Sequence, residues 1–488
     1  MSNATTMAGL PPLPSYSLQP QPALLSSIPD KYLTLVMPII AYWVLSLAFH
    51  FIDTKGYLDK YRLHTPAEVL KRNRVSMRDV IRDVFIQQVI QTIVGIIITM
   101  TEPDEFIGRE EYDIAVWARR IRTAEQYLPS LLGIVGLDAI RLAKQVAPLN
   151  WDLGAALSGG FYPNSNEQMV MSGTEMIFLP AFASWELTAA KVIYYLIKPA
   201  LQFAAAICFL DTWQYFLHRA MHMNQWMYRT FHSRHHRLHV PYAFGALYNH
   251  PFEGFLLDTL GAGLGFKVAG LTIRQGMCFF TGSTIKTIDD HCGYSLPFDP
   301  LQWITENNAV YHDVHHQSWG VKTNFSQPFF TFWDHLLGTA WTGGDVSSRY
   351  ERAAKNAQRL LDKDMSAAKP VTGSDAKLSQ KEAETPYTNE YKNATILDGG
   401  LNSEIDPKMP AGKAEKQAAG SREQVLQDTQ DGGVQIIREE MEEEKLARHD
   451  MRQQSHALSK DESGTLKGLR QRMNSTTLPG CTGGVEVR

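Results

Sequence analysis

The sequence predicts an all-α integral membrane protein with about four transmembrane or re-entrant helical segments, a cytosolic helical histidine-rich cap and a disordered C-terminal tail. Three observations indicate this fold class: long uncharged apolar stretches, one histidine-rich region, and a charged C-terminal stretch that is poor in aromatic residues. Of the 16 histidines, twelve lie between His218 and His335. From Glu351 onward the only aromatic residues are Tyr387 and Tyr391.

The N-terminal residues 1–30 are rich in proline and are expected to be disordered. Residues 31–190 are predicted to hold two membrane helices and an amphipathic insertion. The first helix, residues 32–52, is a run of 21 residues without Asp, Glu, Lys or Arg, which is long enough to cross a hydrocarbon layer of about 30 Å. The second covers residues 84–100, and its three glutamines predict packing against other helices.

Two further apolar segments follow. A third helix is predicted over about residues 192–210, with a kink at Lys198-Pro199. Residues 255–288 are apolar but contain charged residues and several glycines, which predicts a pair of close-packed segments or a re-entrant hairpin. For some of these segments, a buried helix of a soluble protein is the alternative.

The remaining segments are polar or mixed. Within residues 101–175, residues 117–144 have an amphipathic pattern that fits either a helix on a membrane face or an ordinary pair of surface helices. Residues 171–174 are predicted to form a turn that opens the next helix. The tail, residues 346–488, combines high charge with low hydrophobicity and is predicted to be disordered.

Charge in the loop between the first two helices predicts the orientation in the membrane. The loop carries Lys55, Lys60, Arg62, Lys71, Arg72, Arg74, Arg78 and Arg82. Because an excess of Lys and Arg marks cytosolic loops, we expect this loop in the cytosol, together with the histidine motifs and the tail.

Composition excludes two kinds of binding site. The net charge of −4 gives no electrostatic basis for nucleic-acid binding, so no nucleic-acid partner is expected. The four cysteines include no CxxC pair, so neither a disulfide framework nor a thiolate zinc site is expected.

The histidines form three motifs with the spacing of metal ligands. His218 and His222 form HxxxH, and residues 232–236 (HSRHH) and 312–316 (HDVHH) form two HxxHH motifs. On a helix, residues three or four apart share a face, so each motif aims several imidazoles into one volume. Eight such ligands exceed the needs of one ion and match two adjacent ions, for which iron, zinc and copper are suitable. Two neighbouring redox ions can activate dioxygen, which side chains alone cannot do.

Around these motifs the chain resembles the fatty acid hydroxylase/sterol desaturase superfamily of membrane di-iron oxygenases. The segments YRTFHSRHHRLHVPYAFGALYNHPFEG and IDDHCGYSLPFDPLQWITENNAVYHDVHHQSWGVKTNFSQPFFTFWDHLLGT are most similar to the sphinganine 4-hydroxylase (sphingolipid C4-monooxygenase) subfamily of fungi and plants. The resemblance is strong over residues 193–341, loose over the first two helices and absent from the tail. It therefore implies a di-iron domain over residues 191–345.

The resemblance implies two iron ions with ten histidine ligands, eight of which are the motif residues expected to be catalytic. The ten are His218, His222, His232, His235, His236, His250, His291, His312, His315 and His316. The alternative for His250 is a cap on the turn at Pro251. No ligand role is transferred to His239, where relatives are expected to have tyrosine, and His335 is expected to pack or to support a ligand. The residues placed to bind ring N–H groups are Asp211 foremost, then Asn249, Glu253, Asp289, Asp290, Asp313 and Asp334.

The resemblance also implies a monooxygenase of sphingolipid biosynthesis in the endoplasmic reticulum membrane. Such an enzyme adds a hydroxyl group from dioxygen to carbon 4 of a sphingoid base, dihydrosphingosine or dihydroceramide, and gives phytosphingosine or phytoceramide. Electrons would come from NADPH or NADH through cytochrome b5 and its reductase. The lipid is expected to enter from the bilayer past Trp213, Tyr215, Phe216, Phe252 and Phe255.

Three other functions stay open from the sequence. A sterol or sphingolipid desaturase of the same superfamily would use the same histidines. A membrane zinc hydrolase belongs to a different enzyme class, and metal analysis would separate it. A metal transporter or scaffold would need a polar path through the membrane helices, which contain few charges.

Overall fold

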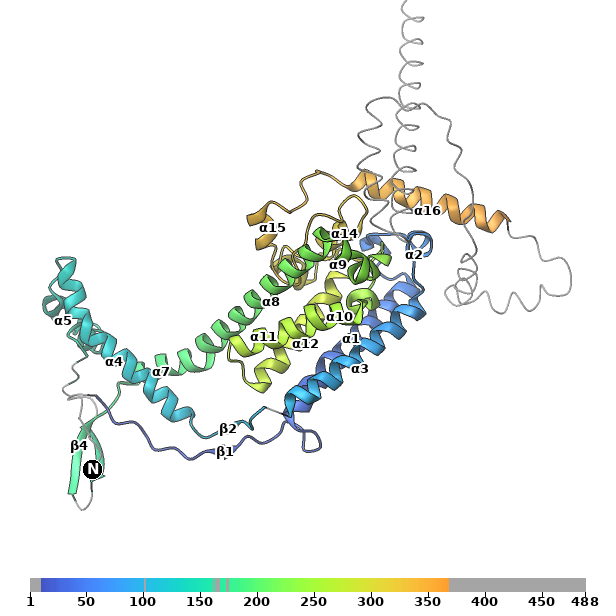
Figure 1. The fold of residues 1–488 in the computed structure, drawn as a ribbon. Coiled ribbons are helices and arrows are strands. Elements are labelled where there is room, and N and C mark those ends of the chain that lie inside the picture. Colours follow the sequence, from blue (N-terminus) through green and yellow to red (C-terminus); the bar gives the residue numbers. More distant parts are fainter. Residues whose placement is uncertain (1–9, 101, 161, 163–166, 173–174, 368–488) are drawn as a thin grey trace, which may run out of the picture.

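The computed structural model describes residues 10–367, apart from 101, 161, 163–166 and 173–174. Helices dominate this part of the chain (Figure 1). Three of them are long and apolar enough to cross a membrane: α1 (Asp30–Lys55), α3 (Met77–Thr99) and the continuous run Ser184–Met223. They correspond to the first three predicted spans. Val44, Ile97 and Leu201 are exposed on them, as expected of side chains in contact with lipid.

The long helices form a bundle with the predicted fourth apolar segment. Helix α12 (Ile273–Asp290) packs along α1, which also contacts α3, and α11 (Gly261–Val268) packs along α8 (Lys198–Met223) (Figure 1). The fourth segment is therefore a helical hairpin. It turns at Gly270, whose φ of 62° lies in the left-handed region that favours glycine.

One local prediction about the long helices agrees with the structure. Gln87 and Gln88 of α3 are buried, and Gln88 Oε1 accepts a hydrogen bond of 2.9 Å from Trp43 Nε1 of α1. Near the predicted kink, the backbone is π-helical over Ile193–Ile197 and becomes α-helical at the residue before Pro199, which has no N–H to donate.

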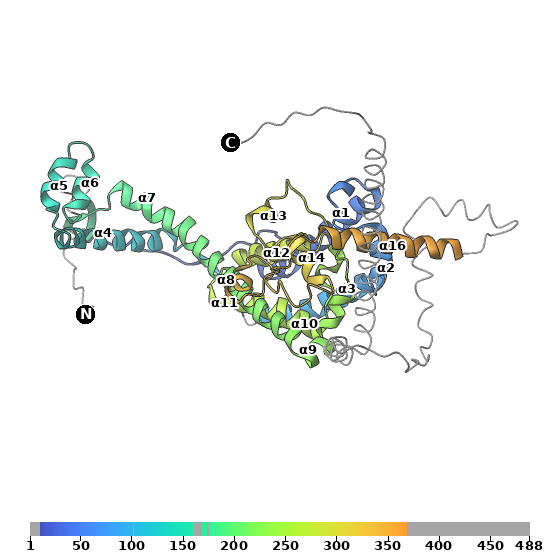
Figure 2. The same ribbon diagram turned by 90° about the horizontal axis from the view of Figure 1, so that it is seen from above.

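The insertion between the second and third spans forms a lobe that lies apart from the bundle (Figures 1 and 2). It contains α4 (Glu110–Ile134), α5 (Ala139–Val146) and α6 (Trp151–Leu157), and α4 packs against α7 (Ser184–Val192), the first part of the third span. The amphipathic stretch is thus a pair of helices, α4 and α5. The buried ion pair of Arg122 with Glu186, 2.5 Å between Nη2 and Oε2, joins α4 to α7.

The predicted turn at residues 171–174 is wrong in part. Strands β3 (Glu167–Ser172) and β4 (Glu175–Pro180) pair as an antiparallel hairpin, and the next helix begins only at Ser184. Residues 173–174 lie outside the described residues. Val170, Ile177 and Phe178 belong to the residue types that favour strands, which explains the difference.

The two termini are also more ordered than expected where the structure describes them. Strand β1 (Gln19–Pro20) pairs with β2 (Phe106–Ile107). Helix α16 (Ser347–Ala367) occupies the start of the predicted disordered tail and packs against α2 (Pro66–Arg72), with Ala353 and Ala357 buried. The other residues of both predicted disordered segments, 1–9 and 368–488, lie outside the described residues.

Short helices complete the described fold. They are α9 (Gln225–Thr230), α10 (Pro251–Gly254), α13 (Pro300–Ile304), α14 (Ala309–His316) and α15 (Phe332–Leu337), the 3-10 helices Asp59–Tyr61, His232–Arg237 and Ala243–Leu247, and the π-helical turn Phe255–Leu260. Figure 1 shows α9 and α14 at the end of the bundle where α8 ends.

Candidate metal centre

Four elements bring the histidine motifs together at this end of the bundle. HxxxH lies on the last turns of α8, the first HxxHH on the 3-10 helix His232–Arg237, and the second on α14. His291 directly follows α12. Asn308 fixes the start of α14, because its side chain accepts a hydrogen bond of 3.0 Å from Tyr311 N.

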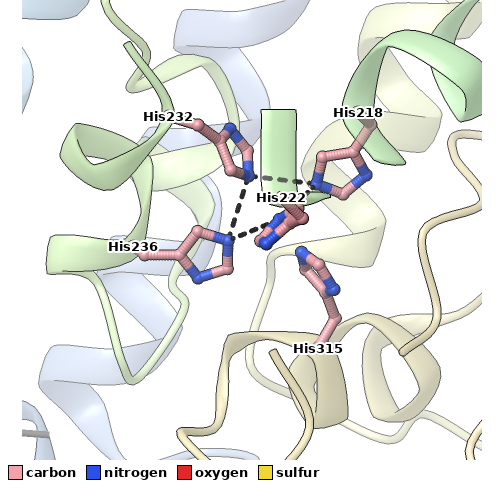
Figure 3. A group of neighbouring side chains, drawn as sticks. All are labelled: His218, His222, His232, His236 and His315. Atoms are coloured by element: carbon pink, nitrogen blue, oxygen red, sulfur yellow. Dashed lines mark hydrogen bonds between the residues drawn. The ribbon is translucent and has the colours of Figure 1, made fainter. Parts of the chain in front are cut away.

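The side chains form two groups, each suited to one metal ion. The first contains His218, His222, His232, His236 and His315, and the second contains His235, His291, His312 and His316. Within each group the ligand atoms lie within 4.8 Å of one another, and all nine residues are buried. The five rings of the first group surround a common space (Figure 3). The groups are adjacent, since the ring centroids of His236 and His316 are 5.0 Å apart.

Backbone carbonyls determine the tautomer of five rings. The Nδ1 atoms of His218, His235, His291, His315 and His316 lie 2.7–3.1 Å from the carbonyl oxygens of Phe325, Tyr248, Thr287, Thr323 and Leu238, respectively. A carbonyl oxygen only accepts, so each of these Nδ1 atoms carries the proton. In the neutral ring, each Nε2 therefore presents a lone pair.

The Nε2 atoms of each group converge at distances typical of ligands on one ion. His218 Nε2 is 3.1 Å from His232 Nε2, and His312 Nε2 is 3.0 Å from His291 Nε2. Nitrogen ligands about 2.0–2.1 Å from one ion lie about 2.9–3.4 Å apart. The buried Nε2 of His315 has no hydrogen-bond partner among the described residues. Converging, unprotonated nitrogens in each group fit a bound metal ion.

Burial keeps the rings in the neutral form that binds metal. It lowers the pKa of His235 to about 3 and the pKa of His291 to about 4. Burial, with neighbouring imidazoles, also holds the pKa values of His232, His236, His312, His315 and His316 well below the ordinary value.

One of the predicted supporting carboxylates contacts a ring of the centre. Glu253 Oε1 lies 2.5 Å from His232 Nδ1, and the carboxyl group is fully buried. Asp211, the favoured residue, is instead bonded to the backbone, where it accepts from Phe329 N (3.2 Å) and Phe330 N (2.8 Å). The other five bind elsewhere: Asn249 to Asp258, Asp289 to Gln302, Asp290 to Lys286, Asp313 to His64, and Asp334 to the backbone N–H groups of Phe325 and Ser326.

Three histidines near the motifs lie outside both groups. His250 Nδ1 accepts a hydrogen bond of 3.2 Å from Phe252 N at the start of α10, so the structure supports the capping alternative and not the predicted ligand role. His239 is buried but belongs to neither group. His335 is exposed and lies 3.1 Å from Glu306, so the packing or supporting role expected for it is wrong.

A buried network behind α14 was not predicted from the sequence. His64 lies between Glu68 and Asp313, with both nitrogen–oxygen distances 2.9 Å, and Tyr350 donates a hydrogen bond of 2.6 Å to Asp313. Burial lowers the pKa of His64, but the two carboxylates outweigh it and raise the pKa to about 9. Asp313 stands next to His312, so the network braces α14, which carries the second HxxHH motif. His64 has no neighbouring histidine, and no sequence signal marked it.

An apolar cavity of about 420 Å³ lies between α1, α3, α11 and α12. A smaller pocket is lined by His232, His235, His291 and His312. The two spaces have four lining residues in common, Gln214, Asp258, Thr287 and Pro328, so they adjoin. Of the five aromatic residues predicted along the lipid path, only Phe255 lines the cavity, whereas Phe216 and Phe252 are exposed.

Comparison with known proteins agrees with this site. Residues 203–339 match the fatty acid hydroxylase family. The sphingolipid C4-hydroxylase of Saccharomyces cerevisiae is 43% identical over 339 residues, which are 70% of this chain and 80% of the relative. Sphinganine C4-monooxygenase 1 of Arabidopsis thaliana is 36% identical over 313 residues, 64% of this chain and 88% of the relative.

A protein of Oryza sativa named a very-long-chain aldehyde decarbonylase is 35% identical over 312 residues, 64% of this chain and 89% of the relative. No solved structure matches the chain. The family match covers the elements that carry all nine grouped histidines, and the relatives are similar over most of their length. The chain therefore belongs to the fatty acid hydroxylase family, which is a family of oxidoreductases.

Proposed function

We propose that this chain is a sphinganine 4-hydroxylase, which adds a hydroxyl group from dioxygen to carbon 4 of a sphingoid base. The observation that carries the proposal is a pair of adjacent, all-histidine groups next to an apolar cavity. The names of the relatives, sphingolipid C4-hydroxylase and sphinganine C4-monooxygenase, support the substrate class and the position of attack.

The two groups would hold two iron ions, one in each. The proposed ligands are the nine grouped histidines, and His250 is left out because it caps α10. When bound, the iron ions would activate dioxygen and allow oxygen insertion into an unactivated C–H bond. The protein's own contribution is orientation. Carbonyls turn the Nε2 lone pairs of five rings inward, and Glu253 holds the ring of His232.

The apolar cavity would hold the alkyl chain of the lipid. Its volume of about 420 Å³ lies within the usual range for small-molecule sites, about 300–1,000 Å³. Leu35, Ile98 and Phe280 are among the apolar side chains that line it. An alkyl chain bound there would exclude water from the cavity. It would place one of its carbon atoms near the four residues that line both spaces, beside the histidine-lined pocket.

The proposed location is the endoplasmic reticulum membrane, with the metal centre at the cytosolic face and the hairpin of α11 and α12 as the fourth membrane segment. The excess of Lys and Arg in the loop between α1 and α3 supports a position of the metal centre on the cytosolic side. The backbone of this loop contacts the histidine-bearing segments, with Arg74 N 2.9 Å from Arg237 O and Leu63 N 2.9 Å from Gly293 O. At that face, cytochrome b5 and its reductase would deliver electrons from NADPH or NADH.

Expression in a host that lacks phytosphingosine tests the proposal. The unaltered chain is expected to restore a sphingoid base that has gained one oxygen atom, and His235→Ala and His315→Ala are expected to abolish it. His335→Ala is the matched control, because this exposed histidine lies outside both groups. Phytosphingosine formed by both ligand variants would overturn the di-iron assignment.

The same experiment separates the alternatives. A desaturase would give a product that has lost two hydrogen atoms, and an aldehyde decarbonylase would leave the sphingoid bases unchanged and shorten very-long-chain aldehydes to hydrocarbons. Zinc in the purified protein, with no need for dioxygen, would indicate a hydrolase.

A further inference from the structure

Asp258 occupies a distinctive position in the cavity that leads to the metal centre. It lies in the π-helical turn Phe255–Leu260 and lines both the apolar cavity and the smaller histidine-lined pocket. Any ligand that reaches from one space into the other therefore passes this carboxylate. Gln214, Thr287 and Pro328 line the same junction.

Asp258 differs from the other carboxylates of these two spaces in its partners. Glu102 pairs with Lys267, Asp290 pairs with Lys286, and Glu253 contacts His232. Among the described residues Asp258 has no cationic partner. Its hydrogen bonds are two long ones from neutral amides, Gln214 Nε2 at 3.4 Å and Asn249 Nδ2 at 3.5 Å.

A carboxylate away from water is costly unless it pairs with a cation or receives strong hydrogen bonds. The neighbouring amides supply only weak ones, so the junction is suited to a ligand that carries a positive charge. The free sphingoid base has such a charge on its amine at carbon 2. Only carbons 2 and 3 lie between that amine and carbon 4, so an amine at the junction keeps carbon 4 beside the histidine-lined pocket.

We infer that Asp258 binds the amino group of the substrate and makes the free, protonated sphingoid base the preferred substrate over its N-acylated form. This inference rests on the proposed 4-hydroxylase function and specifies its substrate. An N-acyl amide carries no charge and leaves the carboxylate without a cation. Asp258 is thus a specificity-determining residue, and the apolar cavity holds the chain beyond carbon 4.

Steady-state kinetics of the full chain, with its electron donors, on three compounds tests the inference. The compounds are sphinganine, N-acetylsphinganine and octadecane-1,3-diol, the analogue with hydrogen in place of the amine. The unaltered chain is expected to favour sphinganine over both others by about 10- to 100-fold in kcat/KM, the effect of one charge-assisted hydrogen bond. Asp258→Asn is expected to raise KM for sphinganine by a similar factor and to leave kcat/KM for the other two within about twofold.

Asp104→Asn is the control, because this exposed carboxylate lies 3.9 Å from Lys31 and does not line either space. Iron content of each variant shows that the metal centre is intact. An unaltered chain that uses the analogue without the amine as well as sphinganine overturns the inference, even if Asp258→Asn fails to fold. Equal losses on all three substrates also overturn it, because they indicate a structural role. If the unaltered chain hydroxylates none of them, the proposed function itself fails.

Discussion

Replacement of Glu253 by glutamine is expected to weaken iron binding about tenfold at pH 8.5, above the pKa of this carboxyl group, and to leave the fold of the two histidine groups intact. Glu253 is fully buried, and its Oε1 atom is 2.5 Å from His232 Nδ1. With a metal on Nε2, the Nδ1–H group donates to the carboxylate, which orients the ring and strengthens it as a ligand. Glutamine keeps an oxygen acceptor of the same shape but removes the negative charge.

The magnitude follows from the kind of hydrogen bond that is changed. A hydrogen bond to a charged group contributes about 1.5–3 kcal/mol, and one between neutral groups about 0.5–1.5 kcal/mol. The difference of about 1.4 kcal/mol corresponds to about a tenfold change in affinity. Glu253→Ala removes the acceptor altogether, and its expected loss is about 100-fold, the upper end of the range for such partners.

The effect of Glu253→Gln also has a predicted pH dependence. Burial raises the pKa of Glu253 to about 8, so below that pH the metal-free protein holds a proton on this carboxyl group. Iron binding must then release the proton, so iron affinity of the unaltered chain rises as the pH increases toward 8. The glutamine variant has no such group and is expected to lack this part of the slope.

Anaerobic titration of the iron-free protein with ferrous iron, in competition with a chromophoric chelator, measures both effects in detergent micelles at about pH 6, 7 and 8.5. Asp289→Asn is the matched control, since Asp289 is a buried carboxylate that accepts its hydrogen bond from Gln302 Nε2 at 2.8 Å. Equal iron affinity of Glu253→Gln and the unaltered chain at every pH would refute the reasoning. An equal loss in the control would show a general effect of buried charge.

Three further predictions concern the cavity and the network behind α14. Thr284→Trp places a large ring in the apolar cavity, so it is expected to raise KM for long-chain bases far more than for shorter ones in the hydroxylase assay. Tyr350→Phe removes the 2.6 Å hydrogen bond to Asp313, so it is expected to cost about 1.5–3 kcal/mol in a denaturant unfolding curve, with Tyr57→Phe, an exposed tyrosine, as the control. The pKa of His64, about 9, lies above the ordinary 6.5, so its stabilisation is complete below about pH 6.5 and is lost as the pH rises through 9. The thermal unfolding midpoint is therefore expected to fall between pH 7 and 10 more steeply for the unaltered chain than for His64→Gln, and equal slopes would contradict this assignment.

Local patterns in the sequence were enough to predict the long helices and the shared face of neighbouring histidines in the motifs. An uncharged apolar run is a property of consecutive residues, and so is the HxxxH spacing that puts His218 and His222 on one helical face. The prediction of a disordered tail failed at the start of the tail, because the average composition of the tail hid a local helical pattern. Helix α16 was overlooked because its buried positions, Ala353 and Ala357, occur within a highly charged stretch.

Isolated residues were placed less well than motifs. Asp211 lies seven residues before His218, on the same face of α8, but seven residues span about 10.5 Å along a helix, which is too far for a direct contact. It binds the segment after α14 instead. His250 has no neighbouring histidine to fix the direction of its ring. At the start of α10 its Nδ1 atom accepts a hydrogen bond from the backbone N–H of Phe252.

The sequence by itself predicted helices long and apolar enough to cross a membrane and a histidine-rich centre with the spacing of metal ligands, because both properties follow from residues close together in the chain. Only the tertiary structure decided how the centre is divided and what lies beside it. His235 and His236 are neighbours in sequence yet belong to different groups, and Asp258 meets the histidine-lined pocket where the π-helical turn Phe255–Leu260 packs against α8. These relations depend on contacts between distant segments and on backbone carbonyls that orient each ring, and no spacing along the chain records them.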